Sequence, residues 1–288
     1  MNKMKQLKQL IPPLLPQLHK GQRGKLAVIG GSEDYTGAPY FAGYSAMLAG
    51  VDLVHIITVE SAASVIKTYS PDLMVHPYRV ERRNQIVDLI SKMDVVIIGP
   101  GLGRERDAMA ELMYLAIDQL VKNKTPLVLD ADALYRLAVD KELQDLVLSN
   151  DTSHLVLTPN VIELRRLADA FNVETEAQLA AKLGCTLLAK SQTDKIFNTV
   201  LLEEPLECKE PGSLKRVGGQ GDTLSGLVGA FLAWNSSVPE KIPLCCLAGS
   251  TAVRIAGHAA YEEHGRGMLA SHLHKHIEDA IRNIEDAE

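Results

Sequence analysis

The chain has 288 residues, of which 46% are hydrophobic and 23% charged, and its formal net charge at pH 7 is −6. The apolar content suffices for the core of one large domain or two small ones, and the acidic balance argues against general nucleic-acid binding, which needs a basic face. Four cysteines without a CxxC spacing favour reduced, buried thiols over a zinc site or a secreted disulfide framework.

The N-terminus predicts neither export nor insertion into a membrane. Residues 1–8 are basic but lack the apolar segment of a signal peptide, and no apolar run reaches the length that spans a bilayer. Residues 1–20 form an N-terminal extension that contains three prolines, and no Gly/Ser/Pro-rich linker divides the remainder. We therefore expect a soluble, cytoplasmic protein with a single domain over residues 1–288.

Short apolar runs alternate with helical patterns from Lys25 almost to the end of the chain. Most of these runs are continuously apolar, which is typical of strands that are covered on both faces of a parallel sheet. The predicted strands are residues 25–29, 53–58, 95–98, 127–129, 155–157 and 186–189. The predicted helices include residues 40–49, 104–121, 133–138, 161–171, 174–182 and 224–234, and the pattern after Asp222 is almost wholly helical through Ile284. This alternation predicts an α/β fold of three layers, with a mostly parallel sheet between helices.

Glycine, acidic and amide residues gather where the predicted strands end. They are Gly30-Gly31-Ser32, Gly99-Pro100-Gly101-Leu102-Gly103, Asp130-Ala131-Asp132 and Thr158-Pro159-Asn160. Ligands of open α/β sheets bind at the carboxyl ends of strands. We therefore expect one crevice built from four strand ends.

The segment 99–103 occupies the position of a dinucleotide fingerprint but reads GPGLG. The spacing differs from GxGxxG, and Pro100 stiffens the turn. We therefore disfavour a hydride-transfer fold and expect close approach of this backbone to another ligand.

Asp130 and Asp132 are candidates for binding Mg²⁺, directly or through water, because magnesium takes few carboxylates and keeps several waters. The alternative, given equal weight, is that Asp132 caps the helix 133–138. At the next strand end, Asn160 and Glu163 have the spacing of a capping box. Arg165 and Arg166 follow and would place cations for a phosphate-bearing substrate at the mouth of the crevice.

The segment 218–222 reads GGQGD and precedes an apolar helix. Its glycines leave backbone N–H groups free to surround an anion at a helix start. Asp222 would repel that anion unless it accepts a proton from a hydroxyl that attacks the bound phosphoryl group. This arrangement suggests phosphoryl transfer from a nucleotide, and the alternative is a helix that Asp222 merely caps.

Four histidines near the C-terminus, His264, His272, His274 and His276, offer a pair spaced by one helical turn. No carboxylate or cysteine completes a convincing ligand set, so a solvated helix face is favoured over a metal site.

Together these motifs resemble those of the ATP-dependent NAD(P)H-hydrate dehydratases of the ribokinase-like superfamily, and most closely the eukaryotic branch. The resemblance runs from about residue 10 to about residue 284. It is carried by GKLAVIGGS at 24–32, YTGAPY at 35–40, AGVDLVH at 49–55, VIKTYSPDLMVHP at 65–77, GPGLGR at 99–104, LDADAL at 129–134, TPNVIEL at 158–164 and GGQGDTLSG at 218–226.

The resemblance implies a ribokinase-like fold and a lyase that repairs nicotinamide cofactors. Such an enzyme would dehydrate the S-form of hydrated NADH or NADPH, with ATP as co-substrate and release of ADP and phosphate. The implied route is phosphorylation of the ring hydroxyl and then elimination of phosphate. Mg²⁺ would accompany the triphosphate. The implied partners are these small molecules, with no nucleic acid or membrane, and a homo-oligomer is left open.

Roles for individual residues follow from the same resemblance. Asp222 would be the base, and the N–H groups of Gly219, Gln220 and Gly221 would stabilise the charge in transfer. The hydrated dinucleotide would contact Gly103, Asn160, Val161, Ile162, Glu163, Leu164, Arg165, Arg166 and Asp222. ATP would lie over Lys190, Ser191, Gln192, Thr193, Asp194, Gly212, Ser213, Leu214, Lys215, Arg216, Val217, Gly218, Gly219, Gln220 and Gly221.

One departure from the family pattern lies in the nucleotide segment. The family's Lys-Gly-x-x-Asp is Lys190-Ser191-Gln192-Thr193-Asp194 here, so a serine replaces a glycine that permits a tight turn. Two alternative functions stay open at this level. One is a ribokinase-like kinase that phosphorylates a vitamin alcohol and stops there, and the other is a nucleotide-binding protein without catalysis.

Overall fold

The computed structural model describes residues 3–105 and 107–287. Its centre is a nine-stranded sheet in the order β3-β2-β1-β4-β5-β6-β7-β8-β9, parallel from β3 to β7 and antiparallel at β8 and β9. The strands are β1 (Lys25–Ile29), β2 (Leu53–Val59), β3 (Met74–Tyr78), β4 (Val95–Ile98), β5 (Leu127–Leu129), β6 (Leu155–Leu157), β7 (Thr186–Ala189), β8 (Lys195–Phe197) and β9 (Leu206–Glu207).

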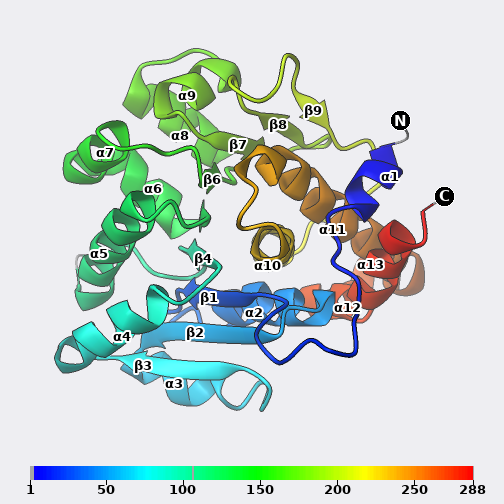
Figure 1. Cartoon of the computed structure of the whole chain (residues 1–288), viewed down its shortest axis with the longest axis horizontal. Coiled ribbons are helices and arrows are strands. Elements are labelled where there is room, and N and C mark those ends of the chain that lie inside the picture. Colours follow the sequence, from blue (N-terminus) through cyan, green and yellow to red (C-terminus); the bar gives the residue numbers. More distant parts are fainter. Residues whose placement is uncertain (1–2, 106, 288) are drawn as a thin grey trace.

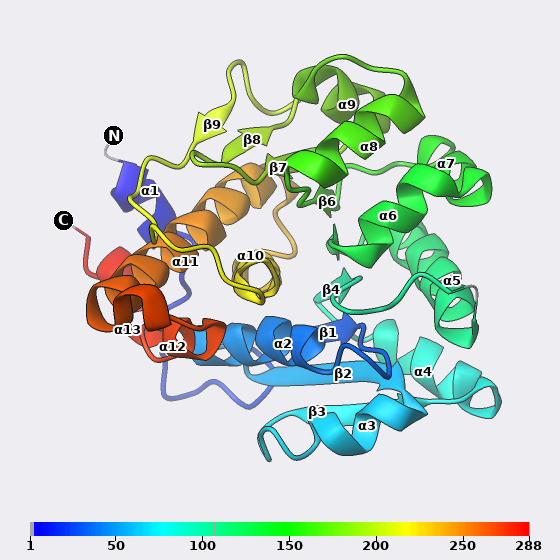
Figure 2. The same cartoon turned by 180° about the vertical axis from the view of Figure 1, so that it is seen from behind.

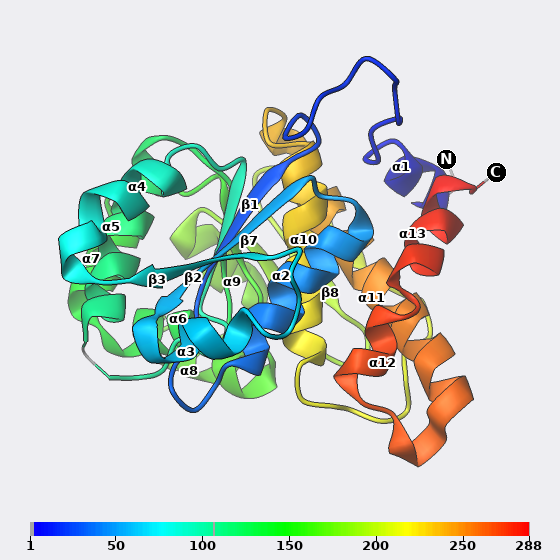
Figure 3. The same cartoon turned by 90° about the horizontal axis from the view of Figure 1, so that it is seen from below.

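Helices cover both faces of the sheet, and each face has its own apolar core. On one face lie α1 (Lys3–Lys8), α2 (Gly37–Ala49), α3 (Glu60–Ile66), α10 (Gln220–Trp234), α11 (Ile242–His264), α12 (Ala270–His274) and α13 (Ile277–Glu285). On the other lie α4 (Arg83–Ile90), α5 (Ala108–Lys122), α6 (Asp132–Val139), α7 (Lys141–Leu148), α8 (Val161–Phe171) and α9 (Glu176–Leu183). Three 3₁₀ turns complete the chain: η1 (Val80–Arg82), η2 (Pro239–Lys241) and η3 (Gly265–Gly267). Figures 1 and 2 show the arrangement from front and back, and Figure 3 shows α2 and α10 on one side of the sheet with α4 and α5 on the other.

The predicted three-layer α/β architecture is therefore confirmed. The predicted strands are all present, β2 being one residue longer than expected, whereas β3, β8 and β9 were not predicted. Among the helices, α5 begins at Ala108 rather than at residue 104, because Asp107 caps it by accepting a hydrogen bond from the Ala110 N–H at 3.0 Å. All four cysteines are free and buried, as the sequence predicts.

Helix α10 lies between the sheet and the outer helices, where Figure 1 shows it end-on. It is apolar around its whole circumference, and every residue from Thr223 to Ala233 is buried. A helix of this composition is stable only inside a core. Its N-terminal turn is therefore held rigidly, and this turn carries Asp222.

The N-terminal extension is packed onto the domain. Leu7 and Leu10 are buried in the same core as α10, and α1 packs against α11 and α13. No helix within the described ranges has an apolar stretch long enough to cross a membrane.

Candidate functional site

The four predicted strand ends meet at one edge of the sheet, because β1, β4, β5 and β6 are consecutive neighbours. The Gly31 N–H donates to the carbonyl of Pro100 at 2.9 Å, and the Gly103 N–H donates to the Asp132 carboxylate at 3.0 Å. From β7, the Lys190 N–H donates to the carbonyl of Pro159 at 2.8 Å. The predicted gathering of these strand ends is confirmed, and β7 adds a fifth strand end to it.

The backbone of the GPGLG turn at 99–103 approaches its neighbours so closely at Gly99 that no side chain fits there. Gly99 has a φ of 123°, and a Cβ there would lie 1.8 Å from the carbonyl oxygen of Asp130. Glycine is therefore required at this position for the strand ends to come together.

Asp222 lies in the first turn of α10, which begins at Gln220 with Gly219 as its N-cap. The interpretation of Asp222 as a helix cap is therefore wrong. The pKa of Asp222 is raised to about 7, mainly by burial; the neighbouring carboxylates of Asp130, Asp132 and Glu163 contribute to the increase, and Lys190 opposes it. A carboxyl group with a pKa near neutrality suits a general base.

Lys190 supplies the positive charge beside Asp222. Its Nζ lies 2.8 Å from Oδ1 of Asp130, which is 1% exposed. Burial alone would lower the pKa of Lys190, but the carboxylates of Asp130 and Glu163 outweigh burial and raise it. A Cβ added at Gly221 would lie 3.5 Å from the same Nζ, so the ammonium group lies directly beside the glycine loop.

Asp130 and Asp132 have protein partners already. Oδ1 of Asp130 accepts from Lys190 and from the Ala131 N–H, whereas Asp132 accepts from Gly103 and from Nε of Arg104 at 3.3 Å. The side chain of Asp132 does not cap α6, so that alternative is wrong. No group of three or more His, Cys, Asp or Glu side chains within residues 3–105 and 107–287 is arranged to hold a metal.

The strand end after β6 forms the predicted capping box. Asn160 accepts from the N–H groups of Ile162 and Glu163, and the Glu163 carboxylate accepts from the Asn160 N–H at 2.8 Å. Burial raises the pKa of Glu163. Val161 and Ile162 remain 62% and 72% exposed, so the first turn of α8 presents an apolar surface to a ligand.

Two arginines converge on Tyr135 beside this turn. The guanidinium carbons of Arg104 and Arg166 lie 4.4 Å and 5.2 Å from the centre of its ring. Buried Arg136 donates to the carbonyls of Arg104 and Glu105 and so fixes the loop that follows Gly103. The sequence pointed to Arg166 but missed Arg104, although Arg104 directly follows the glycine turn.

The two segments predicted to bind ATP lie side by side. Arg216 donates to the carbonyl of Ser191 at 3.2 Å. Lys215 is directed away from the crevice and donates to the carbonyls of Arg266 and Met268, whereas Leu214 is 84% exposed. Ser191 does not have a positive φ, so serine at the family's glycine position causes no backbone strain.

The C-terminal histidines do not share one solvated face. His274 is 6% exposed and packs against Tyr40, Phe41 and Tyr44, and its burial lowers its pKa to about 4. His264 and His272 stack with ring centres 3.7 Å apart, and His276 lies 3.2 Å from the Glu263 carboxylate. The expectation of a solvated face is thus wrong for His274.

Known proteins match almost the whole chain. Residues 26–279 match the family model described as NAD(P)H-hydrate dehydratase. The chain is 36% identical to the ATP-dependent (S)-NAD(P)H-hydrate dehydratase of Saccharomyces cerevisiae, over 96% of this chain and 95% of the yeast protein. It is 38% identical to the protein of the same description from Caenorhabditis elegans, over 97% and 94% of the two chains.

Solved structures share the fold. A ribokinase-like superfamily protein from Enterococcus faecalis has a TM-score of 0.78 at 23% identity, over 100% of this chain and 96% of that one. The ADP/ATP-dependent NAD(P)H-hydrate dehydratase of Bacillus subtilis, co-crystallized with ATP/Mg²⁺, has a TM-score of 0.71 at 21% identity, over 98% of this chain and 95% of that one. These similarities confirm the ribokinase-like fold.

Proposed function

Because the chain belongs to the NAD(P)H-hydrate dehydratase family, we propose that its strand-end crevice is the active site of an ATP-dependent lyase. The enzyme removes water from the S-form of hydrated NADH or NADPH and restores the reduced cofactor. The observation that carries the assignment of the site is the position of Asp222, a partly buried carboxyl group with its pKa raised to about 7, in the first turn of α10 and beside Lys190.

Asp222 accepts the proton of the ring hydroxyl while that oxygen attacks the terminal phosphoryl group of ATP. The N–H groups of Gly219, Gln220 and Gly221 stabilise the negative charge in transfer, and Lys190 adds a cation beside them. Elimination then breaks the ring carbon–oxygen bond, releases phosphate and removes a proton from the neighbouring ring carbon, so that the ring double bond forms again and the cofactor is restored. The raised pKa of Asp222 supports this role, because a base of this strength is about half deprotonated near neutral pH.

Asp130 and Asp132 would hold the Mg²⁺ that accompanies the triphosphate, and would do so through water, because both carboxylates already accept hydrogen bonds from the protein. Magnesium keeps several waters and needs few protein ligands, so this set of donors fits the ion. The ion would supply charge neutralisation between the phosphates.

The hydrated dinucleotide lies along Gly103 and the first turns of α8, over residues 160–166. Arg104 and Arg166, held over Tyr135, face its phosphate groups. Their positive charge supports this role, because the chain as a whole is acidic. Within the described residues Arg166 forms no ion pair, whereas Arg104 pairs with Asp132. Guanidinium groups are the side chains best suited to phosphate oxygens.

Recovery of the reduced nicotinamide tests the function directly. The protein is incubated with hydrated NADH as a mixture of S and R forms, ATP and Mg²⁺, and the absorbance of the dihydronicotinamide ring is followed. We expect the S form alone to be consumed, with one ADP and one phosphate released per NADH restored. Absence of recovery, together with phosphorylation of a vitamin alcohol, would instead identify a kinase, and ATP binding without turnover of either compound would identify a non-catalytic nucleotide binder.

A further inference from the structure

Arg254 lies in the middle of α11, far along the chain from the predicted site residues, and is 7% exposed. Its Nε donates to Oδ2 of Asp194 at 3.1 Å, and its Nη2 lies 3.0 Å from Oδ1. The guanidinium thus grips the carboxylate with both branches of its fork, the geometry that fixes orientation as well as charge.

The remaining donors of Arg254 reach the two segments over which ATP is proposed to lie. Nη2 also donates to the carbonyl of Ser191 at 3.1 Å, and Nη1 donates to the carbonyl of Glu210 at 3.3 Å. The backbone of Gly212 lies against the same side chain, since a Cβ there would be 3.6 Å from Cγ and Nη1 of Arg254. One side chain therefore connects the turn at 190–194 to the start of the segment at 212–221.

The carboxylate of Asp194 is satisfied by the same set of groups. Besides Arg254, it accepts from the Ser191 N–H at 2.9 Å and from Oγ of Ser250 at 2.7 Å. Ser250, Arg254 and Gly257 lie on one face of α11, at spacings of four and three residues. A Cβ at Gly257 would lie 3.7 Å from Nε2 of Gln220 and 3.8 Å from Oγ of Ser213, so this face of the helix runs beneath both nucleotide segments.

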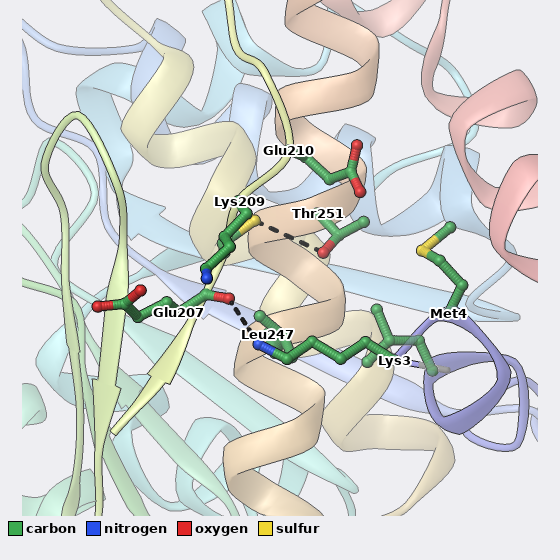
Figure 4. Close-up of a pocket in the computed structure, with 9 residues that line it drawn as sticks. Lys3, Met4, Glu207, Lys209, Glu210, Leu247 and Thr251 are labelled. Carbon is green, nitrogen blue, oxygen red and sulfur yellow. Dashed lines mark hydrogen bonds between the residues drawn. The ribbon is translucent and has the colours of Figure 1, made fainter. Parts of the chain in front are cut away.

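A hollow of about 240 Å³ borders the segment that leads to Gly212, and it is lined by residues of α1 and α11 and by residues 207–210 (Figure 4). Glu210 and Thr251 border it. The hydrogen bond from Arg254 to the Glu210 carbonyl holds the segment beside this hollow.

We propose that Arg254 is a positioning residue for ATP, which holds the two nucleotide segments at a fixed separation before the nucleotide binds. The proposal rests on the proposed function for the placement of ATP. A site that is already formed loses less conformational entropy on binding, so the contribution of Arg254 appears in the affinity for ATP. Once ATP is bound, the reacting groups around Asp222 are unchanged.

The test compares Arg254→Lys with Arg136→Lys. Lysine keeps the charge at 254 but cannot bond Asp194, Ser191 and Glu210 together. Arg136 is the matched control, a buried arginine that bonds two carbonyls on the opposite side of the crevice. We expect Arg254→Lys to weaken MgATP binding about tenfold or more in calorimetry without hydrate, and Arg136→Lys to change it by less than about twofold.

The kinetic constants provide the second measurement. For Arg254→Lys we expect the KM for ATP to rise about tenfold, while kcat at saturating ATP and the KM for the hydrate stay within about threefold of wild type. For Ser250→Ala, which removes one donor to Asp194 and retains the guanidinium, we expect a weakening of ATP binding of about twofold to fivefold. This variant decides the question if Arg254→Lys does not fold.

Wild-type affinity for MgATP in folded Arg254→Lys, or an equal loss in Arg136→Lys, would overturn the proposal. A protein that binds MgATP but leaves hydrated NADH unchanged contradicts the proposed function, and the effect of Arg254→Lys on ATP binding still decides the role of Arg254. If the wild-type protein does not bind MgATP, both proposals are wrong.

Discussion

Two largely buried ion pairs hold the two ends of the turn at 190–194, Lys190–Asp130 and Arg254–Asp194, and they differ in how fully their charges are satisfied. Asp194 accepts from Arg254, Ser250 and the Ser191 N–H, so donors surround its carboxylate. Lys190 bonds one carboxylate, that of Asp130, while the charges of Glu163 and Asp222 remain nearby. The closed network, around Asp194, fixes the geometry of the segments that it connects, whereas the open network, around Lys190, retains charge that a phosphoryl group and a hydroxyl can use.

The largest expected effect is that of Asp222→Asn on the open network. Loss of the base should lower kcat by about a thousandfold or more, while the affinity for MgATP changes by less than about threefold, because the glycine loop and Lys190 remain. Steady-state kinetics and calorimetry measure the two quantities. Full activity in this variant would contradict the mechanism.

Asp194→Asn should have the largest effect on stability. It leaves Arg254 buried without its partner, and breaking a buried pair in this way costs about 3–5 kcal/mol. Asp130→Asn should cost less than half as much, because Lys190 still has Glu163 and Asp222 close by. Denaturant unfolding of both variants against wild type measures the difference, and equal losses would mean that the two networks do not differ as described.

Substitutions at Gly219 and Gly221 should affect different properties, the first stability and the second turnover. Gly219→Ala is expected to lower the free energy of unfolding by about 2 kcal/mol or more, because φ is 90° and the new Cβ would lie 2.7 Å from the ring of Phe41. Gly221→Ala, within α10, should leave the stability unchanged or raise it by about 0.5–1 kcal/mol. Its methyl group, beside Nζ of Lys190, should nevertheless lower turnover about tenfold or more. Thermal unfolding and kinetics on the same preparations provide both readings, and normal turnover in Gly221→Ala would remove the loop from the proposed anion site.

The pH dependence tests the titration of Asp222. Because the unprotonated form is active, kcat/KM should fall about tenfold per pH unit below about 7 and level off above it. The stability contribution has the opposite sign. The folded protein holds this proton to about pH 7 and the unfolded chain releases it near 3.8, so the contribution is complete below about 3.8 and is lost as the pH rises through about 7.

Asp222→Asn removes this dependence. Relative to wild type, the variant should therefore gain stability on going from about pH 4 to about pH 8. Melting temperatures of the two proteins across this range measure the gain, and a constant difference would contradict the raised pKa.

The smallest effect is expected for Ser191→Gly. The backbone of Ser191 lies outside the left-handed region, and its bonds to Arg254 and Arg216 use the carbonyl group that glycine also has. The affinity for MgATP should change by less than about twofold. A larger change in calorimetry would show that the serine hydroxyl, which donates to the Thr193 carbonyl, matters to the nucleotide site.

The strand ends could be predicted because their signals are local. Continuous apolar runs followed by glycines or acids indicate buried parallel strands with ligands at their ends. The strands with these signals are neighbours in the sheet, so their ends lie together. Strand β3 could not be found in this way, because it lies at the edge of the sheet and contains Pro77 and the half-buried His76. Strands β8 and β9 are too short to show a period.

Arg254 and Ser250 could not be predicted, because their partner lies 56–60 residues away in the sequence. Two polar residues one turn apart in a long apolar helix are the signal that could have been followed. The roles of Asp130 and Asp132 at a magnesium ion stay predictions.

The residues proposed for the two substrates come from separate stretches of the chain. Apart from Asp222, those for the hydrated dinucleotide lie between 103 and 166, and those for ATP lie between 190 and 221, with the bond from Lys190 to Asp130 joining the two parts. The acceptor pocket could therefore change during evolution while the phosphoryl-donating part stayed intact.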